Sequence, residues 1–312
     1  MRFEFYSERL AGSDPISVDG IVPGGGLHLT HWQGNRTPAS LKADTSTGIA
    51  LRFVTSPDRA ELARGAEVAS NNHFDADGAL SVWTVLTGER AAERAALLVA
   101  AAEAGDFSAH SGREGLKVAL ALQGEDGVSP LASQVRGAPV DDDEESYRLV
   151  LPLVGELVAG PDRFEPLWRD GLAAIDAAMD GFAAGRSRVA EDAGCLVSAV
   201  QLAGGVSLEA ARYAISHHAR GRLYLIAWQA EDGGRRYRVD WPYWSWAETV
   251  NRPRIDRVDL EPAAARLRAL DPGGDWHLKR GHIADAIESA GSRALPDAVA
   301  GELRAALGRA ER

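Results

Sequence analysis

Cysteine is almost absent from the chain, since Cys195 is the only one among 312 residues. A single thiol cannot form a disulfide within the chain, so a small scaffold held together by disulfides is excluded. No run of about eighteen apolar residues occurs, which argues against a membrane-spanning helix. The first residues carry Glu4 and Glu8 and lack an apolar segment, so we expect no secretory signal. These absences favour the cytoplasm and give no reason to expect a membrane as a partner.

An excess of positive charge is also lacking, because 34 Lys and Arg residues face 45 Asp and Glu residues, for a formal net charge of −11. Proteins that coat long nucleic acids must neutralise many phosphates, which requires a basic surface. Long nucleic acid is therefore not expected as a partner. A short nucleotide or a small phosphorylated molecule, held in a local basic pocket, stays compatible with this charge, and association into a homodimer is left open.

The apolar periodicity predicts an alternation of short strands and helices. Strands are expected at 27–33, 48–54, 66–70, 195–202, 222–228 and 236–241. Helices are expected at 79–86, 91–104, 150–158, 160–186, 207–216, 261–270 and 297–307. The last two strands are expected to form a hairpin through the turn Asp232-Gly233-Gly234. Alternating strands and helices of this kind are typical of an α/β fold.

A change in composition marks the expected boundary between two domains. Residues 124–146 hold several Gly, Pro and Ser residues and end in an acidic run, which is typical of a solvated loop. We therefore predict an N-terminal α/β domain at 1–135, a helical connector at 146–190 and a smaller C-terminal α/β domain at 191–312. In the first domain we expect a mostly parallel sheet with flanking helices.

Metal-ligating side chains are concentrated just after the strand expected at 66–70. His73, Asp75 and Asp77 occupy alternate positions in Asn-His-Phe-Asp-Ala-Asp-Gly-Ala-Leu-Ser, residues 72–81. Residues two apart in an extended backbone project to the same side, so one imidazole and two carboxylates can converge. Such a set suits manganese, magnesium or zinc. Gly78 allows a turn into a helix, whose N-terminus is an anion site. The motif therefore predicts a site that handles a divalent metal or a phosphate.

Two other interpretations of the motif are a calcium-binding loop and a helix cap. A calcium-binding loop that starts at His73 would need a bidentate Glu where Thr84 stands, so that interpretation fails. A purely structural interpretation has Asp75 or Asp77 cap the following helix, with Gly78 in the turn. Caps of this composition are common, so the sequence leaves the choice open between a metal site and a capped helix.

The stretch from His73 to Ser81 resembles the first motif of the DHH phosphoesterases, a superfamily of RecJ-type exonucleases, oligoribonucleases and inorganic pyrophosphatases. Its members read His-x-Asp-x-Asp-Gly, or a close variant, on a strand-to-helix turn. His73, Asp75 and Asp77 match this pattern position for position. The resemblance implies that these residues bind manganese or magnesium ions, which activate a water for attack on phosphorus, with Asp75 and Asp77 as catalytic carboxylates. It covers the motif alone, and we expect the whole chain to belong to an uncharacterised bacterial family.

The rest of the DHH pattern is missing from the sequence. No Asp stands out at the end of a strong strand as a second motif, and no Asp-His-His signature occurs. Asp106 and Asp44 are the nearest spare carboxylates, so Asp106 is predicted as a further metal ligand, with Asp44 as the alternative. Asp106 lies at an expected helix end, where a solvated or capping role is the competing interpretation. The missing motifs leave a second function open, a non-catalytic binding or scaffold protein that retains the DHH-like turn. A hydrolase that acts on a carbon substrate is a third alternative.

Substrate contacts are predicted from aromatic and basic residues. Residues 241–246 read Trp-Pro-Tyr-Trp-Ser-Trp and lie between arginines, which suits a pocket for a nucleobase and a phosphate. Packing between domains is the equally weighted alternative. We predict Trp244 and Arg254 as substrate-binding residues, together with Lys42 beside a hydroxyl-rich turn. The predicted function is a metal-dependent phosphoesterase-like hydrolase that acts on a small phosphorylated or nucleotide substrate.

Overall fold

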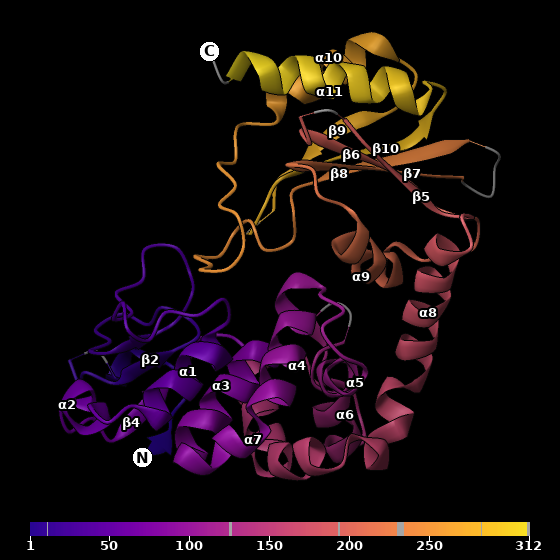
Figure 1. Ribbon diagram of the computed structural model, residues 1–312. Helices are drawn as coiled ribbons and strands as arrows, with labels where there is room; N and C mark the ends of the chain where they lie inside the picture. Colours follow the sequence, from indigo (N-terminus) through magenta and orange to yellow (C-terminus); the bar gives the residue numbers. More distant parts are fainter. Residues whose placement is uncertain (11, 125–126, 193, 230–233, 282, 311–312) are drawn as a thin grey trace. The chain divides into compact units, whose positions relative to one another are not determined.

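A computed structural model describes residues 1–10, 12–124, 127–192, 194–229, 234–281 and 283–310 (Figure 1). The chain divides into two compact units. Unit 1 comprises Met1–Leu172 and Ala247–Pro253, and unit 2 comprises Ala173–Trp246 and Arg254–Arg312. The chain therefore returns from unit 2 to unit 1 for one short segment, Ala247–Pro253, which we call the strap. The predicted division into domains at 1–135, 146–190 and 191–312 stays a prediction.

Unit 1 contains a parallel four-stranded sheet in the order β1-β4-β2-β3. Its strands are β1 (Arg2–Phe3), β2 (Ile16–Val18), β3 (His28–Leu29) and β4 (Val68–Ser70). Every residue of β2, β3 and β4 is buried, as is usual for parallel strands that are covered on both faces. Parallel strands share one carboxyl edge, so the residues that follow β2, β3 and β4 are brought together at that edge.

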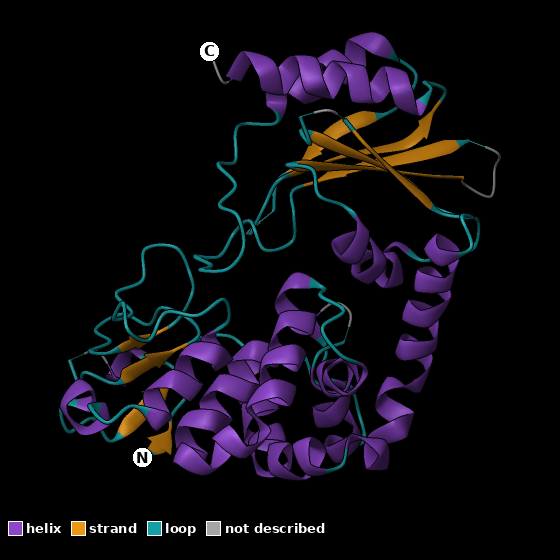
Figure 2. Cartoon of the chain, in the orientation of Figure 1, coloured by secondary structure: helices purple, strands orange, loops and turns teal. Residues whose placement is uncertain are grey.

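Helices form most of the rest of unit 1, as Figure 2 shows. They are α1 (Ser46–Thr55), α2 (Arg59–Ala63), α3 (Ala76–Thr87), α4 (Ala95–Phe107), α5 (Arg113–Leu122), α6 (Pro130–Arg136), α7 (Asp143–Ala159) and the first part of α8 (Glu165–Ala183), with 3₁₀ turns η1 (Glu8–Leu10), η2 (Gly88–Arg94) and η4 (Pro161–Phe164). Helix α3 packs against α1, α4 and α7. The core of the unit lies between these helices and the sheet, and it includes Ile16, Phe53, Leu80, Leu98 and Val150.

The strand expected at 48–54 is wrong, because these residues lie in α1. The hydroxyl of Thr45 accepts a hydrogen bond from the Gly48 amide and caps the helix. Residues 46–51, 53 and 54 are buried, so the helix shows no polar face, and a short apolar run of this kind fits a buried strand equally well. The strand expected at 27–33 is confined to β3, whereas the run at 66–70 is confirmed in β4.

Unit 2 contains a six-stranded mixed sheet in the order β5-β6-β7-β8-β10-β9. Its strands are β5 (Arg188–Glu191), β6 (Val197–Gln201), β7 (Leu223–Gln229), β8 (Arg235–Asp240), β9 (Trp276–Lys279) and β10 (Ala286–Ser292). Its helices are α9 (Leu208–His218), α10 (Glu261–Leu270), α11 (Pro296–Ala310) and the end of α8. Strands β6 and β7 pair in parallel, and the other pairings are antiparallel. Part of the turn expected at 232–234 lies outside the described residues.

Strand β7 explains how helices cover both faces of this sheet. Leu223 and Leu225 point into the core beneath α10 and α11, whereas Tyr224 and Ile226 point into the core beneath α9. This alternation follows from the two-residue period of a strand, and Figure 2 shows α9 on the face opposite to α10 and α11. The predicted α/β fold class, with a parallel sheet and a second α/β unit, is confirmed. In the described ranges no helix is long and apolar enough to cross a membrane.

Candidate metal centre

Acidic and histidine side chains converge at the carboxyl edge of the parallel sheet of unit 1. Asp19 directly follows β2, and His31 lies two residues beyond β3. The turn from β4 into α3 carries His73 and Asp75, and Asp77 lies in the first turn of α3. These five residues form two overlapping groups whose ligand atoms lie within 4.8 Å of one another, and Asp19 belongs to both.

The first group is Asp19, His73 and Asp75, which we call the outer half-site. The Nε2 atom of His73 lies 3.0 Å from Oδ2 of Asp19 and 3.4 Å from Oδ2 of Asp75. The side chains of His73 and Asp75 are 27% and 22% exposed, whereas Asp19 is buried. This half-site can therefore be reached from solvent.

The second group is Asp19, His31 and Asp77, which we call the inner half-site. The Nε2 atom of His31 lies 3.7 Å from Oδ2 of Asp77 and 3.9 Å from Oδ1 of Asp19. Asp106 approaches the same nitrogen with Oδ2 at 3.2 Å. All four side chains are at most 4% exposed. Asp19 thus directs Oδ2 toward the outer half-site and Oδ1 toward the inner one, as a shared carboxylate would.

Asp106 reaches the inner half-site because α4 approaches the start of α3 closely. A Cβ atom at Gly105 would lie 2.8 Å from the Cβ of Ala76, so only glycine permits this approach without a shift. Asp106 is the next residue along α4, and its side chain is buried. The structure thus brings Asp106, the predicted further ligand, to His31.

The orientation of His31 is set by a backbone carbonyl. Its Nδ1 atom lies 2.7 Å from the carbonyl oxygen of Asp44, which can only accept, so Nδ1 must carry the proton. In the neutral imidazole the lone pair therefore lies on Nε2, which faces the carboxylates of Asp77 and Asp106. Histidines that bind metals commonly donate their other ring N–H in this way.

Capping and ligand geometry coexist at the two motif aspartates. Oδ1 of Asp75 accepts a hydrogen bond of 2.7 Å from the Gly78 amide and caps α3, while Oδ2 faces His73. Asp77 accepts hydrogen bonds of 2.7 Å from the amides of Ser46 and Thr47 at the N-terminus of α1. The structural interpretation of the motif is therefore correct in part, and it leaves one oxygen of Asp75 directed at the cluster.

Burial and mutual repulsion perturb the ionisation of the cluster. Burial and the charge of Asp19 raise the pKa of Asp77 to about 6. Burial and the charge of Asp77 likewise hold the pKa of Asp106 well above its usual range. Burial opposes ionisation of Asp19, but contact with His73 outweighs it, so the pKa of Asp19 lies below its usual value. Burial opposes protonation of His73, yet hydrogen bonds to Asp19 and Asp75 raise its pKa to about 11.

The donor set fits a divalent cation. Mixed imidazole and carboxylate ligands suit manganese, magnesium or zinc. Neighbouring ligands of an octahedral ion with bonds of about 2.1 Å lie about 3 Å apart, close to the 3.0 and 3.4 Å separations in the outer half-site. Carboxylates outnumber imidazoles in this buried cluster, so a bound cation would offset uncompensated negative charge. The buried Asp19, His31 and Asp77 group can therefore hold a metal ion.

A second layer of contacts supports Asp19. The side-chain amide nitrogen of Asn71 donates to the Tyr147 hydroxyl at 2.7 Å and to Oδ2 of Asp19 at 3.4 Å. The amide oxygen of Asn71 accepts from the Gly20 backbone at 2.9 Å. These contacts tie the turn after β2 to the end of β4. A Cβ atom at Gly78 would lie 2.6 Å from the Tyr147 hydroxyl and 3.1 Å from Asp19 Oδ2, so these contacts leave no space for a side chain at position 78.

The other predicted residues are placed elsewhere. The Asp44 carboxylate accepts from the amides of Val250 and Asn251, so its contribution to the cluster is the carbonyl that holds His31. Lys42 belongs to unit 1 and pairs with Glu248 at 2.9 Å. Trp244 and Arg254 both belong to unit 2. Their roles in substrate binding stay predictions.

The aromatic residues 241–246 serve in part as packing within unit 2. Trp241 is buried in the core beneath α10 and α11, and Tyr243 in the core beneath α9. The guanidinium of Arg212 lies 4.9 Å from the ring centre of Tyr243. Burial of this kind favours packing over a ligand platform at these two positions.

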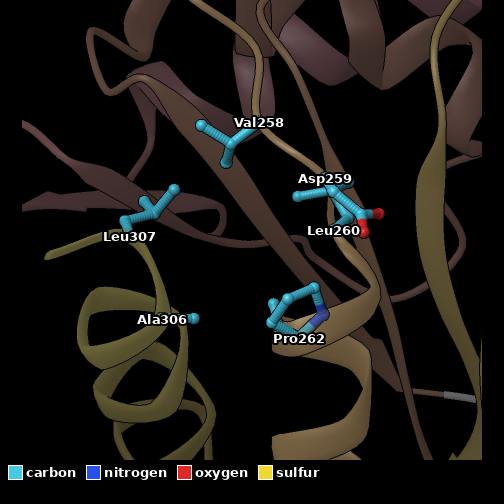
Figure 3. Close-up of a pocket in the computed structure, with 7 residues that line it drawn as sticks. Val258, Asp259, Leu260, Pro262, Ala306 and Leu307 are labelled. Atoms are coloured by element: carbon cyan, nitrogen blue, oxygen red, sulfur yellow. The ribbon is translucent and has the colours of Figure 1, made fainter. Parts of the chain in front are cut away.

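Unit 2 also contains a cavity of about 240 Å³ between α10, α11 and the segment before α10 (Figure 3). It is lined by Val258, Asp259, Leu260, Pro262, Ala263, Ala306 and Leu307. One carboxylate among apolar side chains offers no set of convergent polar groups. The candidate metal centre is therefore better placed in the Asp and His cluster of unit 1.

Asp19 and His31 were not recognised from the sequence. Asp19 ends the short apolar run Ile16-Ser17-Val18 and precedes Gly20, which is the same strand, Asp and Gly pattern that the central motif shows. His31 was included in the strand expected at 27–33 rather than placed beyond its end. A strand expected at 16–18, and a strand ending at Leu29 rather than at residue 33, would place Asp19 and His31 just beyond strand ends, where ligands bind in parallel sheets.

The chain belongs to DUF6687, a family of unknown function whose model matches residues 1–292. The matched range includes all residues of the metal cluster and the strap. No curated protein matches the chain. The expectation that the whole chain belongs to an uncharacterised family is confirmed in this form, whereas the DHH resemblance rests on the motif.

Proposed function

We propose that the protein is a metal-dependent phosphoesterase that uses a two-cation centre with Asp19 as the shared ligand. One observation carries the proposal: the two oxygens of Asp19 face different imidazoles, Oδ2 that of His73 at 3.0 Å and Oδ1 that of His31 at 3.9 Å. A carboxylate placed between two nitrogen ligands in this manner suits two cations held side by side. Asp75 completes the outer half-site, and Asp77 with Asp106 completes the inner one.

The set of ligands supports a catalytic function over a scaffold. The scaffold alternative arose because the sequence lacked ligands beyond His73, Asp75 and Asp77. Asp19, His31 and Asp106 supply three further ligand side chains at the same edge of the sheet. A protein that had lost its activity would have little reason to keep so many carboxylates buried together, since their mutual repulsion opposes folding.

Bound manganese or magnesium would lower the pKa of a water and neutralise the charge of a phosphoryl group. The residues of the chain then have separate tasks. The outer half-site is the partly exposed side, so we infer that the substrate phosphate enters there, past His73 and Asp75. The buried inner half-site excludes water from Asp77 and His31 and keeps their geometry constant. The N-terminus of α3, which follows Asp75, favours an anion at the same place.

The charge of the chain limits the class of substrate. A net charge of −11 disfavours long nucleic acid. We propose a small phosphorylated molecule or a short nucleotide, with Lys42 of unit 1 as a candidate contact. Lys42 would have to exchange its ion pair with Glu248 for the phosphate.

Metal content and hydrolysis test the proposal directly. Purified protein is loaded with manganese, its metal content is measured by mass spectrometry, and hydrolysis of bis(p-nitrophenyl) phosphate and of a dinucleotide is followed. Asp19→Asn should abolish both metal binding and hydrolysis, because Asp19 belongs to both half-sites. Asp58→Asn is the matched control, since Asp58 is an exposed aspartate of unit 1 whose side chain makes no cap bond.

The outcomes separate the alternatives. Manganese binding that depends on Asp19, together with manganese-dependent hydrolysis, supports the enzyme. Metal binding without hydrolysis of any phosphoester would instead support a binding protein. A wild-type protein that binds no divalent metal would refute the two-cation centre.

A further inference from the structure

The strap, Ala247–Pro253, contacts the backbone around His31. The Glu248 amide donates to the carbonyl oxygen of His31 at 2.7 Å, and Ala247 forms an antiparallel bridge with Trp32. The start of the strap therefore pairs in an antiparallel manner with the residues that follow β3. One ligand of the inner half-site is held on its main chain by a segment far away in the sequence.

The same strap holds the side chain of His31 through Asp44. Oδ1 of Asp44 accepts hydrogen bonds from the amides of Val250 and Asn251 at 2.7 and 2.8 Å. The carbonyl oxygen of Asp44 accepts the Nδ1 proton of His31 at 2.7 Å. The position of the Asp44 backbone, and with it the rotation of the imidazole, is therefore linked to the strap.

Arg252 links the strap to α4, which carries the other buried ligand. Its Nη2 donates to Oε1 of Glu103 at 2.9 Å, and its guanidinium lies 4.8 Å from the ring centre of Phe107. Glu103 and Phe107 flank Asp106 on α4. Arg252 also places Nε 3.6 Å from Oδ2 of Asp44. One side chain thus connects the support of His31 with the helix of Asp106.

The outer half-site is held by different contacts. Asp75 is fixed by its cap bond to Gly78, and Asp19 is supported by Asn71. Both contacts belong to the turns after β2 and β4, and neither involves the strap. The ring of His73 lies 5.4 Å from that of Trp32, which bridges to Ala247 at the start of the strap. Arg252 and Asp44 are linked instead to α4 and His31, so changes at these two residues are expected to alter the inner half-site and to spare the outer one.

We propose that the strap is a positioning element that sets the distance between His31 and Asp106 and thereby the affinity of the inner half-site for its cation. The inference rests on the proposed two-cation centre. Metal affinity requires ligand positions within a few tenths of an ångström, and loss of a contact that orients a ligand commonly weakens binding by about 10- to 100-fold. Arg252 is a strap residue whose side chain contacts both α4 and Asp44.

The test is a manganese titration of the full chain, followed by electron paramagnetic resonance and calorimetry. Wild type should bind two manganese ions and show a spin-coupled spectrum. Asp77→Asn, which removes an inner ligand, identifies the inner binding step. Arg252→Ala should weaken that step by about 10- to 100-fold and leave the outer step unchanged, so the spectrum at intermediate manganese concentration becomes that of an isolated ion.

Matched variants separate positioning from general damage. Val250→Ala alters a strap side chain that is 47% exposed but keeps the backbone amide that Asp44 uses, so it should titrate like wild type. Asp44→Asn, with a weaker acceptor for the same amides, should shift the inner step in the same direction as Arg252→Ala. It provides a second test if Arg252→Ala does not fold.

Each result has a defined meaning. A selective loss at the inner step in the Arg252 or Asp44 variants supports the strap as a positioning element. Unchanged affinity at both steps overturns it and leaves the two-cation centre intact. Equal weakening at both steps also overturns it, because general destabilisation does not distinguish the half-sites. A wild type without bound manganese overturns both proposals.

Discussion

Protonation of His73 should make the stability of the metal-free protein fall as the pH rises above neutrality. Hydrogen bonds to Asp19 and Asp75 outweigh burial and raise the pKa of His73 to about 11, from an ordinary value of 6.5. Because the folded pKa is the higher one, the folded state holds an extra proton between these two values. The stabilisation is complete below pH 6.5 and is lost as the pH rises toward 11.

The size of the effect follows from the width of the pH interval. One proton of difference changes the free energy of unfolding by 1.36 kcal/mol per pH unit. The unfolded His73 is half protonated at pH 6.5 and almost unprotonated at pH 8.0, so between these values the contribution of His73 should fall by about 1.6 kcal/mol. The raised pKa of Asp77, about 6, acts in the same direction, but its loss of stability is mostly complete below this interval.

The assay compares matched proteins in the presence of a chelator. Urea unfolding is measured at pH 6.5 and at pH 8.0 for wild type and for His73→Gln, so that groups common to both proteins cancel in the difference. His277→Gln is the control, because His277 is half exposed in unit 2. Nuclear magnetic resonance of the histidine ring carbons should show no titration of His73 between pH 5 and pH 9.

Two results would refute this reasoning. The first is a His73 resonance that titrates near pH 6.5, and the second is a wild-type stability that changes with pH no more than that of His73→Gln. Manganese should reverse the pH dependence, because a metal ligand must be a neutral imidazole and the ion then displaces the proton. The stabilisation by added manganese should therefore increase from pH 6.5 to pH 8.0.

Three further predictions follow from packing, from the metal centre and from the substrate contacts. Gly78→Ala should lower the free energy of unfolding by about 1–3 kcal/mol, because the new Cβ would lie 2.6 Å from the Tyr147 hydroxyl. Its control, Gly155→Ala, would make no contact closer than 3.6 Å and should raise the free energy of unfolding by up to about 1 kcal/mol. Removal of manganese by a chelator should lower the melting temperature. Manganese added at 100 times its dissociation constant should then raise the free energy of unfolding by about 2.7 kcal/mol. If Lys42 binds the phosphate, Lys42→Met should raise KM at unchanged kcat. It should change the free energy of unfolding by less than about 1 kcal/mol, the usual contribution of a partly exposed ion pair.

Local features of the site could be predicted from the sequence, because they depend on neighbours in the chain. The alternation of His73, Asp75 and Asp77 is visible in ten consecutive letters, and so is the turn at Gly78. Asp106 is predicted only as one of two spare carboxylates, because its place near a helix end by itself favours a solvated or capping role. The α/β class also follows from local periodicity, although the apolar run in α1 was assigned to a strand because its burial leaves no polar face.

The other parts of the site depend on contacts between distant segments. Asp19 and His31 join the motif only because β2 pairs with β4 and β3 pairs with β2. Strands of two or three residues carry too few side chains to reveal this order in a sequence. The strap is more distant still, since nothing in residues 247–253 indicates that they return to unit 1 and contact His31. Long-range pairing of this kind is decided by packing of the whole unit.

Capping and metal binding, which the sequence presents as alternatives for Asp75, can be separated by one substitution. Serine caps a helix about as well as aspartate, because its hydroxyl also accepts from the third residue of the helix. Asp75→Ser should therefore keep the bond to the Gly78 amide and lose the carboxylate oxygen that faces His73 at 3.4 Å. Metal-free Asp75→Ser should lose the ion pair with His73 but keep the cap, so it should be about 1 kcal/mol more stable than Asp75→Ala, which loses both. Both variants should bind manganese weakly at the outer half-site. Manganese binding by Asp75→Ser as strong as that of wild type would show that Asp75 is a helix cap and no ligand.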